Sequence, residues 1–231
     1  MSFAVRPIGL VKSAFVFRQT ISSDATNYVL RNAAITAGWD GIVPLDAEVT
    51  VASGIVLSAN STSLYGFDTG SGFPAGTTLK LIMPGYVCGM GGAGGAAYTA
   101  GSNGGPALRA QYAISIDAAG GVIGGGGGGG GGNKSGGGGG GGRSGRTNAA
   151  GSPTGASGTF SSGGNGGNSG GAGGTTGPGD DGSGTSGGGG GGWGASGGTT
   201  GSYAGGTGGA AVVGNSYITW INTGTRYGAI T

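Results

Sequence analysis

GGVIGGGGGGGGGNKSGGGGGGGRSGR, residues 120–146, contains nine consecutive glycines, three polar residues and then seven further glycines. Nine of the chain's 68 glycines precede Cys88 and three follow Ala210, so 56 of them lie in the 122 residues between. Glycine has no side chain with which to build an apolar core. The region is therefore either a flexible spacer or a structure made from backbone alone.

The spacer interpretation follows from the behaviour of Gly/Ser-rich chains, which are random coils in isolation. Two features argue against it. A strand-like segment, AAVVGNSYITWINTGTRYGAIT (210–231), follows the glycines, so they do not form a tail. In GMGGAGGAA (89–97) the non-glycine residues Met90, Ala93 and Ala96 fall at every third position. A period of three fits neither an α-helix nor a β-strand.

A three-residue period is that of the extended left-handed helix with three residues per turn. Its amides point sideways, so they can bond only to other helices packed around it. A helix surrounded on all sides must be glycine at every position, because a Cβ would hold its neighbours apart. We therefore predict that residues 124–132, 136–142 and 187–192 are central polyglycine II helices of a packed bundle, with the period-three stretches as its outer layers.

The sequence before residue 89 has the composition of an ordinary folded domain. SSDATNYVLRNAAITAGWDG (22–41) predicts one helix, with Ser23 or Asp24 as its N-cap and Gly38 at its end. The valine-rich alternation in AEVTVASGIVLSA (47–59) predicts two strands joined by a turn.

Similar strand-and-turn patterns return from three distant places. LKLIMPGYVCGMGGAGG (79–95) and YAISIDAAGGVIGGGGG (112–128) share a strand, a turn, a short apolar pair and a glycine run, and YITWINTGTRYGAI (217–230) repeats the strand, turn and second strand. We predict that these strands lie side by side in one sheet, in the same layer as the strands of residues 47–59.

The predicted fold is mostly β or irregular, with a small N-terminal α+β part, a packed polyglycine II bundle and a C-terminal strand. Three units follow: a strand-rich attachment domain at 1–88, a glycine-rich domain with exposed loops at 89–211, and strands at 212–231 that return to the N-terminal part.

Composition excludes several classes of function. The net charge of +2, with 8% charged residues, is too weak to predict binding to nucleic acid or to an anionic membrane. Histidine is absent and Cys88 is the only cysteine, so a disulfide or a Cys/His zinc site within the chain is excluded. No apolar run is long enough for a membrane span and no clean secretory signal is present. We expect no enzymatic activity, no cofactor and synthesis in a cytoplasm.

Long glycine runs joined by short polar or aromatic loops, together with GGAGG (91–95) and GGNGGN (163–168), resemble the adhesins at the tips of phage long tail fibres. Those adhesins contain a sandwich of polyglycine helices whose end loops contact the bacterial surface. The resemblance implies a virion protein of the tail fibre or tail tip. It also implies a bacterial surface receptor as its partner (an outer-membrane protein, glycan or pilus), together with other phage tail proteins. A homotrimer is one arrangement that it allows.

If successive helices run out and back, their loops alternate between two ends. Residues 79–88, 106–123 and 212–231 share the base, and 175–182 is expected to form one of the far turns. The far end then presents the predicted receptor-binding residues Tyr98, Asn133, Lys134, Asp180, Asp181 and Tyr203. If the count of turns is reversed, the alternative contact residues are Arg143, Arg146 and Phe160. Two other functions fit the same scaffold: a purely structural tail component that caps or cements a fibre, and an ice-binding protein.

Overall fold

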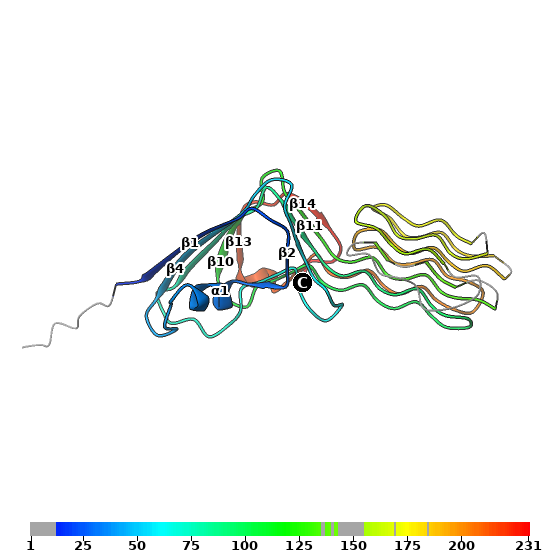
Figure 1. The fold of residues 1–231 in the computed structure, drawn as a ribbon, viewed down its shortest axis with the longest axis horizontal. Helices are drawn as coiled ribbons and strands as arrows, with labels where there is room; N and C mark the ends of the chain where they lie inside the picture. Colours follow the sequence, from blue (N-terminus) through cyan, green and yellow to red (C-terminus); the bar gives the residue numbers. More distant parts are fainter. Residues whose placement is uncertain (1–12, 135–136, 140, 143–154, 169, 184) are drawn as a thin grey trace, which may run out of the picture.

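A computed structural model describes residues 13–134, 137–139, 141–142, 155–168, 170–183 and 185–231. The molecule consists of a three-sided prism of short parallel strands and a glycine-rich extension that projects from one corner of the prism (Figure 1). No helix among the described residues is both long and apolar enough to cross a membrane.

Three parallel sheets form the sides of the prism. Sheet A contains, in spatial order, β1 (Phe15–Ile21), β4 (Leu45–Val51), β7 (Thr78–Ile82), β10 (Ile114–Asp117) and β13 (Ile218–Asn222). Sheet B contains β14 (Thr225–Tyr227), β11 (Val122–Gly124), β8 (Tyr86–Cys88), β5 (Val56–Ser58) and β2 (Ala25–Thr26). Sheet C contains β12 (Val212–Val213), β9 (Leu108–Arg109), β6 (Phe67–Asp68) and β3 (Tyr28–Val29).

The chain winds around the prism and adds one strand to each sheet in turn, so every neighbour in a sheet comes from the previous or the next coil. Side chains alternate between the two faces of each strand. In β4 the alternation is strict, and the inward residues Leu45, Val49 and Val51 are fully buried. The prism interior is therefore an ordinary apolar core, to which all three sheets contribute Leu57, Phe67, Leu81, Val87, Leu108, Ile116, Ile123 and Val212.

The predicted strands are present, and most of them lie where they were expected. Residues 47–59 contain parts of β4 and β5 on either side of Gly54, which adopts φ +78° at the corner of the prism. Strands β7, β10 and β13, from the three repeated segments, are neighbours in sheet A as predicted, and β4 lies beside β7 in the same sheet. The second strand of residues 47–59, β5, pairs with β8 in sheet B, so the prediction that both strands share this layer is wrong for β5, because the chain turns the corner of the prism at Gly54. The chain is mostly strand and irregular structure, as predicted.

The helix predicted over 22–41 is largely wrong. Only α1 (Leu30–Thr36) is helical, and a 3₁₀ turn, η1 (Asn215–Tyr217), lies near the C-terminus. The start of the segment instead forms β2 and β3, because these residues pair with β5 and β6 of the next coil. The N-cap is Val29, without a side-chain hydrogen bond, so neither Ser23 nor Asp24 caps the helix. Gly38, at φ +103°, follows the last turn as predicted.

Two glycine-rich excursions leave the prism from the same corner, between sheets B and C. One follows β8 and returns at β9, and the other follows β11 and returns at β12 (Figure 1). The range 89–211 thus includes three strands, β9, β10 and β11, that belong to the prism. Both excursions begin as direct continuations of paired strands, since Cys88 is in register with Gly124.

Candidate functional site

The described residues of 89–107, 125–142 and 155–211, here called the glycine lattice, are held together by backbone hydrogen bonds between segments. Successive N–H groups of the central stretch 126–132 donate in turn to three neighbouring segments. Every third N–H bonds to the same neighbouring segment. The N–H groups of 126, 129 and 132 donate to the carbonyls of 105, 102 and 99, respectively. Those of 127 and 130 donate to the carbonyls of 142 and 139, and those of 128 and 131 donate to the carbonyls of 195 and 198.

Successive carbonyls of residues 124–131 accept hydrogen bonds in turn from three other neighbouring segments. Those of 124, 127 and 130 accept from the N–H groups of 89, 92 and 95; those of 125, 128 and 131 from 194, 191 and 188; and those of 126 and 129 from 209 and 206. The central stretch is therefore surrounded by six segments, and the N–H groups of 126–132 and the carbonyls of 124–131 are all hydrogen-bonded without a regular sheet.

This packing leaves no space for side chains. A Cβ added at Gly128 would overlap the carbonyl oxygen of Gly206, and one at Gly129 would overlap that of Ala93. Both obstacles are backbone atoms, which have no rotamer by which to move aside. The long glycine runs are thus required by close approach of neighbouring backbones.

The directions of the segments define two ends of the lattice. Residues 89–95 run parallel to 124–130 and residues 99–105 run antiparallel to them, so the chain reverses at Tyr98, away from the prism. Tyr98 itself adopts φ +60°. The same reasoning places further reversals at this end, here called the distal turns, near Asn133, Asn168, Ser183–Ser186 and Thr200–Tyr203.

The distal turns contact one another although they come from distant parts of the chain. The rings of Tyr98 and Tyr203 meet edge to face with centroids 5.9 Å apart. The side-chain amide of Asn133 donates to the hydroxyl of Thr200 (3.2 Å), which in turn donates to the carbonyl of Ser186 (2.6 Å). Asn168 donates to Thr185 in the same way (3.0 Å). These contacts make one surface of five turns.

Asp181 stabilises the edge of this surface. Its Oδ1 accepts from the backbone N–H (2.6 Å) and the hydroxyl (2.8 Å) of Thr199, immediately before the last distal turn. The N–H of Thr199 holds the pKa of Asp181 below its usual value, and the Thr199 hydroxyl adds to this effect. Asp180 is also exposed and its backbone N–H donates to Ala172, so it lies on the flank of the lattice.

The prediction that residues 175–182 form a far turn is wrong. The backbone N–H of Trp193 donates to the backbone carbonyl of Thr175, and the Trp193 ring packs against Tyr86 and Tyr227 of sheet B. The turn after Thr175 therefore lies at the prism. The missed feature is a reversal at Asn168, which has φ +56°. Residues 163–166 pair antiparallel with 171–174, so what reads as one outgoing segment is an out-and-back pair.

Of the alternative contact residues, Phe160 lies at the prism end. Its ring contacts Tyr86 and Trp193, each edge to face with centroids 5.5 Å apart. Together with Tyr227 these residues form an aromatic junction between the lattice and sheet B. Arg143 and Arg146 lie outside the described residues. The structure thus brings Tyr98, Asn133, Lys134, Asp181 and Tyr203 to one end and separates Phe160 from them.

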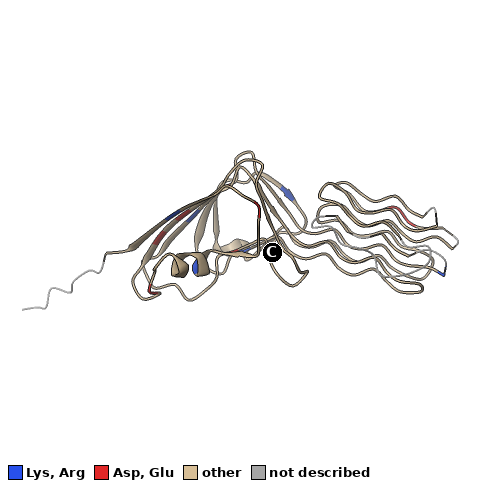
Figure 2. Cartoon of the chain, in the orientation of Figure 1, with Lys and Arg blue, Asp and Glu red and all other residues tan. Residues whose placement is uncertain are grey.

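Charge is sparse over the lattice (Figure 2). Lys134 is exposed beside Asn133, whose own Oδ1 accepts the N–H of Lys134 (2.7 Å). The described residues contain no cluster of three or more His, Cys, Asp or Glu side chains that could hold a metal ion. Among the described residues, the distal end offers aromatic rings, amides, hydroxyls, the Lys134 ammonium group and the Asp181 carboxylate, which suit recognition of another molecule.

Comparisons with known proteins agree with this architecture. A family model described as "Phage tail fibre adhesin Gp38" matches residues 16–231. A chain in the crystal structure of the gp37-gp38 adhesin tip complex of the bacteriophage S16 long tail fiber is 25% identical, with a TM-score of 0.66 over 93% of this chain and 82% of that chain. No curated protein matched. The protein therefore belongs to the phage tail fibre adhesin Gp38 family.

Proposed function

We propose that the distal turns form the surface with which this tail-fibre adhesin contacts a receptor on the bacterial cell. The observation that carries the proposal is that hydrogen bonds and a ring contact join five separate turns at the end of the molecule farthest from the prism. Turns fixed in this way have little conformational entropy to lose on binding, which raises affinity. They also tolerate sequence change without disturbing the scaffold behind them.

The glycine segments are, in this proposal, polyglycine II helices packed side by side. Support comes from the rotation of successive amides among neighbours with a period of three, which is the period of that helix. None of the glycines at 125–132 adopts the left-handed φ typical of turns. Such a bundle is a stiff spacer, so it carries the distal turns away from the prism at a fixed angle.

Within the distal surface, Tyr98 and Tyr203 are the proposed anchors. Tyr98 is 50% exposed, and its ring is oriented by the contact with Tyr203. Aromatic side chains supply large contact areas at low entropic cost. Asn133 and Lys134 add hydrogen-bond donors beside them. Asp181 has a positioning role, because its carboxylate is engaged with Thr199.

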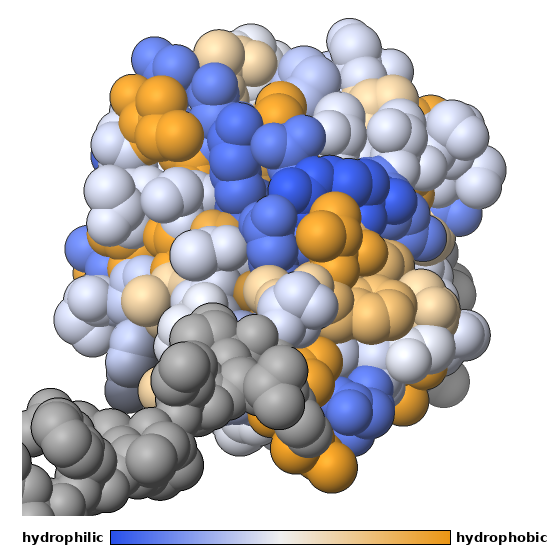
Figure 3. Space-filling view, turned by 90° about the vertical axis from the view of Figure 1, so that its left-hand side faces the viewer, coloured by the Kyte–Doolittle hydropathy of each residue, from blue (hydrophilic) through white to orange (hydrophobic). Residues whose placement is uncertain are grey.

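The opposite end of the molecule is proposed to dock on the rest of the tail fibre. Large apolar side chains are exposed there on β1, on α1 and in the loop after it, namely Val16 (61%), Ile35 (42%) and Ile42 (70%). Figure 3 views this end, where apolar residues lie between polar ones. The similar S16 chain is part of a complex with gp37, which supports a fibre protein as the partner at this face.

Adsorption of phage carrying altered adhesins tests the receptor surface. The double change of Tyr98 and Tyr203 to Ala should reduce adsorption to host cells by about tenfold or more, in line with the loss of two aromatic anchors. A control with Ile230→Ala, an exposed apolar residue of the prism, should adsorb normally. Normal adsorption by the double variant would reject the distal surface. Loss of the adhesin from the particles would instead indicate a structural role in the tail.

A further inference from the structure

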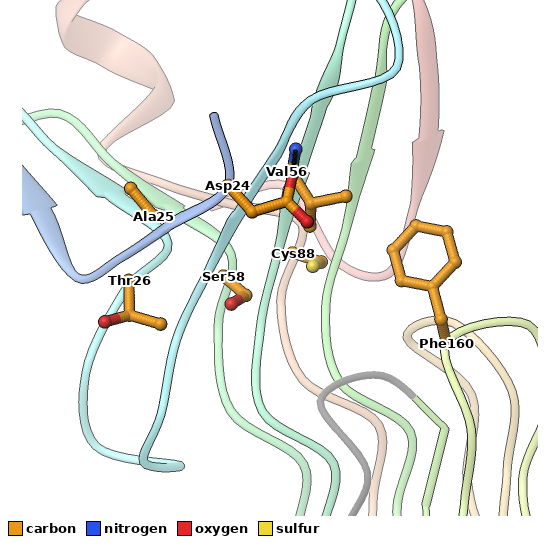
Figure 4. Close-up of a pocket in the computed structure, with 7 residues that line it drawn as sticks. All are labelled: Asp24, Ala25, Thr26, Val56, Ser58, Cys88 and Phe160. Carbon is orange, nitrogen blue, oxygen red and sulfur yellow. Dashed lines mark hydrogen bonds between the residues drawn. The ribbon is translucent and has the colours of Figure 1, made fainter. Parts of the chain in front are cut away.

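A groove lies between Phe160 of the aromatic junction and the part of sheet B formed by β2, β5 and the end of β8, and it belongs to neither end described above (Figure 4). Its volume is about 530 Å³, within the range of about 300–1,000 Å³ typical of small-molecule sites. We propose that this groove binds a neutral sugar residue. The site lies apart from the distal turns, and its occupancy does not depend on their role.

The floor of the groove is built from adjacent parallel strands. Thr26 of β2 is in register with Ser58 of β5, which is in register with Cys88 of β8, so these side chains form one row across sheet B. Adjacent strands are about 4.8 Å apart. The Thr26 and Ser58 hydroxyls therefore stand side by side at a spacing suited to different hydroxyls of one sugar ring. Neither hydroxyl hydrogen-bonds to another described residue.

Asp24 supplies a fixed carboxylate at the rim. Its Oδ1 accepts the backbone N–H of Val56 (2.9 Å), which holds the side chain beside the groove. Its Oδ2 has no partner among the described residues. Hydrogen bonds from a hydroxyl to a carboxylate are stronger than those between neutral groups, so Asp24 is the principal polar contact for a polyhydroxylated ligand.

Phe160 forms the opposite wall (Figure 4). Its ring is oriented by edge-to-face contacts with Tyr86 and Trp193 and remains 41% exposed. A pyranose has one face of C–H groups and a rim of hydroxyls. An aromatic wall facing a row of hydroxyls and a carboxylate matches that amphipathic shape better than it matches a purely apolar ligand.

The charge of the groove narrows the class of sugar. Asp24 is its charged residue, and no Lys or Arg lines it among the described residues. An acidic sugar would place a second carboxylate or a phosphate near Asp24 without a compensating cation. The groove therefore selects neutral sugars over uronic acids or sugar phosphates.

Saturation-transfer NMR on the full chain tests this site, with the methyl glycosides of glucose, galactose, mannose and N-acetylglucosamine as probes and methyl glucuronide as the acidic comparison. At least one neutral glycoside should receive saturation, and the acidic one should receive much less. Asp24→Asn retains the acceptor for Val56, and Thr26→Val retains the shape of the side chain. Each should weaken binding, with Asp24→Asn doing so by about tenfold.

Two controls keep the result specific to the groove. Ile230→Ala, at an exposed residue of the prism that does not line the groove, should leave glycoside binding unchanged. Thr20→Val removes an exposed hydroxyl from β1, outside the groove, and should also have no effect. The proposal is overturned if no neutral glycoside binds, if methyl glucuronide binds equally well, or if Asp24→Asn and Thr26→Val bind as the unaltered chain does. Failure here would leave the distal surface untouched, because that surface is tested by adsorption.

Discussion

The prism and the glycine lattice bury their backbones in different ways. In the prism, strands bond to neighbours on two sides, and the remaining directions are filled by side chains such as Leu81 and Ile116. At the centre of the lattice, the peptide groups around Gly128 bond to six neighbouring segments, and residues 124–132 have no side chains at all. The comparison teaches that a core can be specified either by complementary side chains or by their complete absence.

The two kinds of core should differ in which substitutions they tolerate. An apolar interior accepts replacements of similar volume and loses stability gradually as atoms are removed. The central stretch 125–132 contains no side chain to remove, and a carbon added at any of its glycines would meet main-chain atoms. We expect the lattice to be the more sensitive of the two to single substitutions, although it contains the less complex sequence.

The largest effect is expected for Gly128→Ala. The new Cβ would overlap the Gly206 carbonyl, so the lattice must separate locally and lose hydrogen bonds to several neighbours. The cost should exceed about 4 kcal/mol, the range of exceptional single substitutions. Thermal unfolding followed by calorimetry would measure it.

Gly177→Ala is the matched control for that change. Gly177 lies in the same lattice, but a Cβ there meets no atom within 4 Å, and its carbonyl still accepts from Gly192. Its melting temperature should be unchanged within error. Equal destabilisation by the two variants would show that loss of glycine flexibility, and not close packing, limits the lattice.

A smaller effect is expected in the prism for Leu81→Ala. Leu81 is fully buried in β7, and such truncations typically cost about 2–5 kcal/mol. The register of 89–95 with 124–130 continues from the β8–β11 pair, so the lattice should unfold in the same transition. Denaturant unfolding followed both by tryptophan fluorescence and by backbone amide signals would check this. Two separate transitions would mean that the lattice folds independently of the prism.

The smallest effect concerns two carboxylates with different partners. The pKa of Asp46 in sheet A is lowered by Arg18, whose guanidinium lies 2.7 Å away, whereas that of Asp181 is lowered by the N–H and hydroxyl of Thr199. Both groups therefore stabilise the fold above the ordinary Asp pKa of about 3.9, and this contribution is lost as the pH falls through each lowered folded-state value.

Salt should separate the two carboxylates. About 1 M NaCl screens an exposed ion pair strongly, so the pKa of Asp46 should rise toward its ordinary value while that of Asp181 changes less. NMR titration of the two carboxyl carbons measures both in one sample. An equal rise for the two groups would show that hydrogen bonds to neutral donors are not what lowers the pKa of Asp181.

Local patterns predicted much of this molecule. The period of three at Met90, Ala93 and Ala96 indicated the glycine packing, and the three repeated strand segments indicated one shared sheet. Both patterns arise because packing repeats along the chain. The reversal at Asn168 was missed because a left-handed Asn within a glycine-rich segment leaves no change in composition.

Other features depend on residues that are distant in sequence. The helix over 22–41 was predicted too long, because pairing of β2 and β3 with the next coil overrides local helix propensity. The contact between Tyr98 and Tyr203 and the groove between Asp24 and Phe160 each join distant segments. No local pattern could place these pairs together, since each depends on the number of reversals between them.

Amide hydrogen exchange at residues 126–132 is the most direct test of a core built from backbone alone. Every N–H in this stretch donates to a neighbouring segment, so all of them should exchange only on global unfolding, as slowly as the amides of β4 and β7. Exchange at the rate of an unstructured glycine chain, while the prism amides stay protected, would contradict the account.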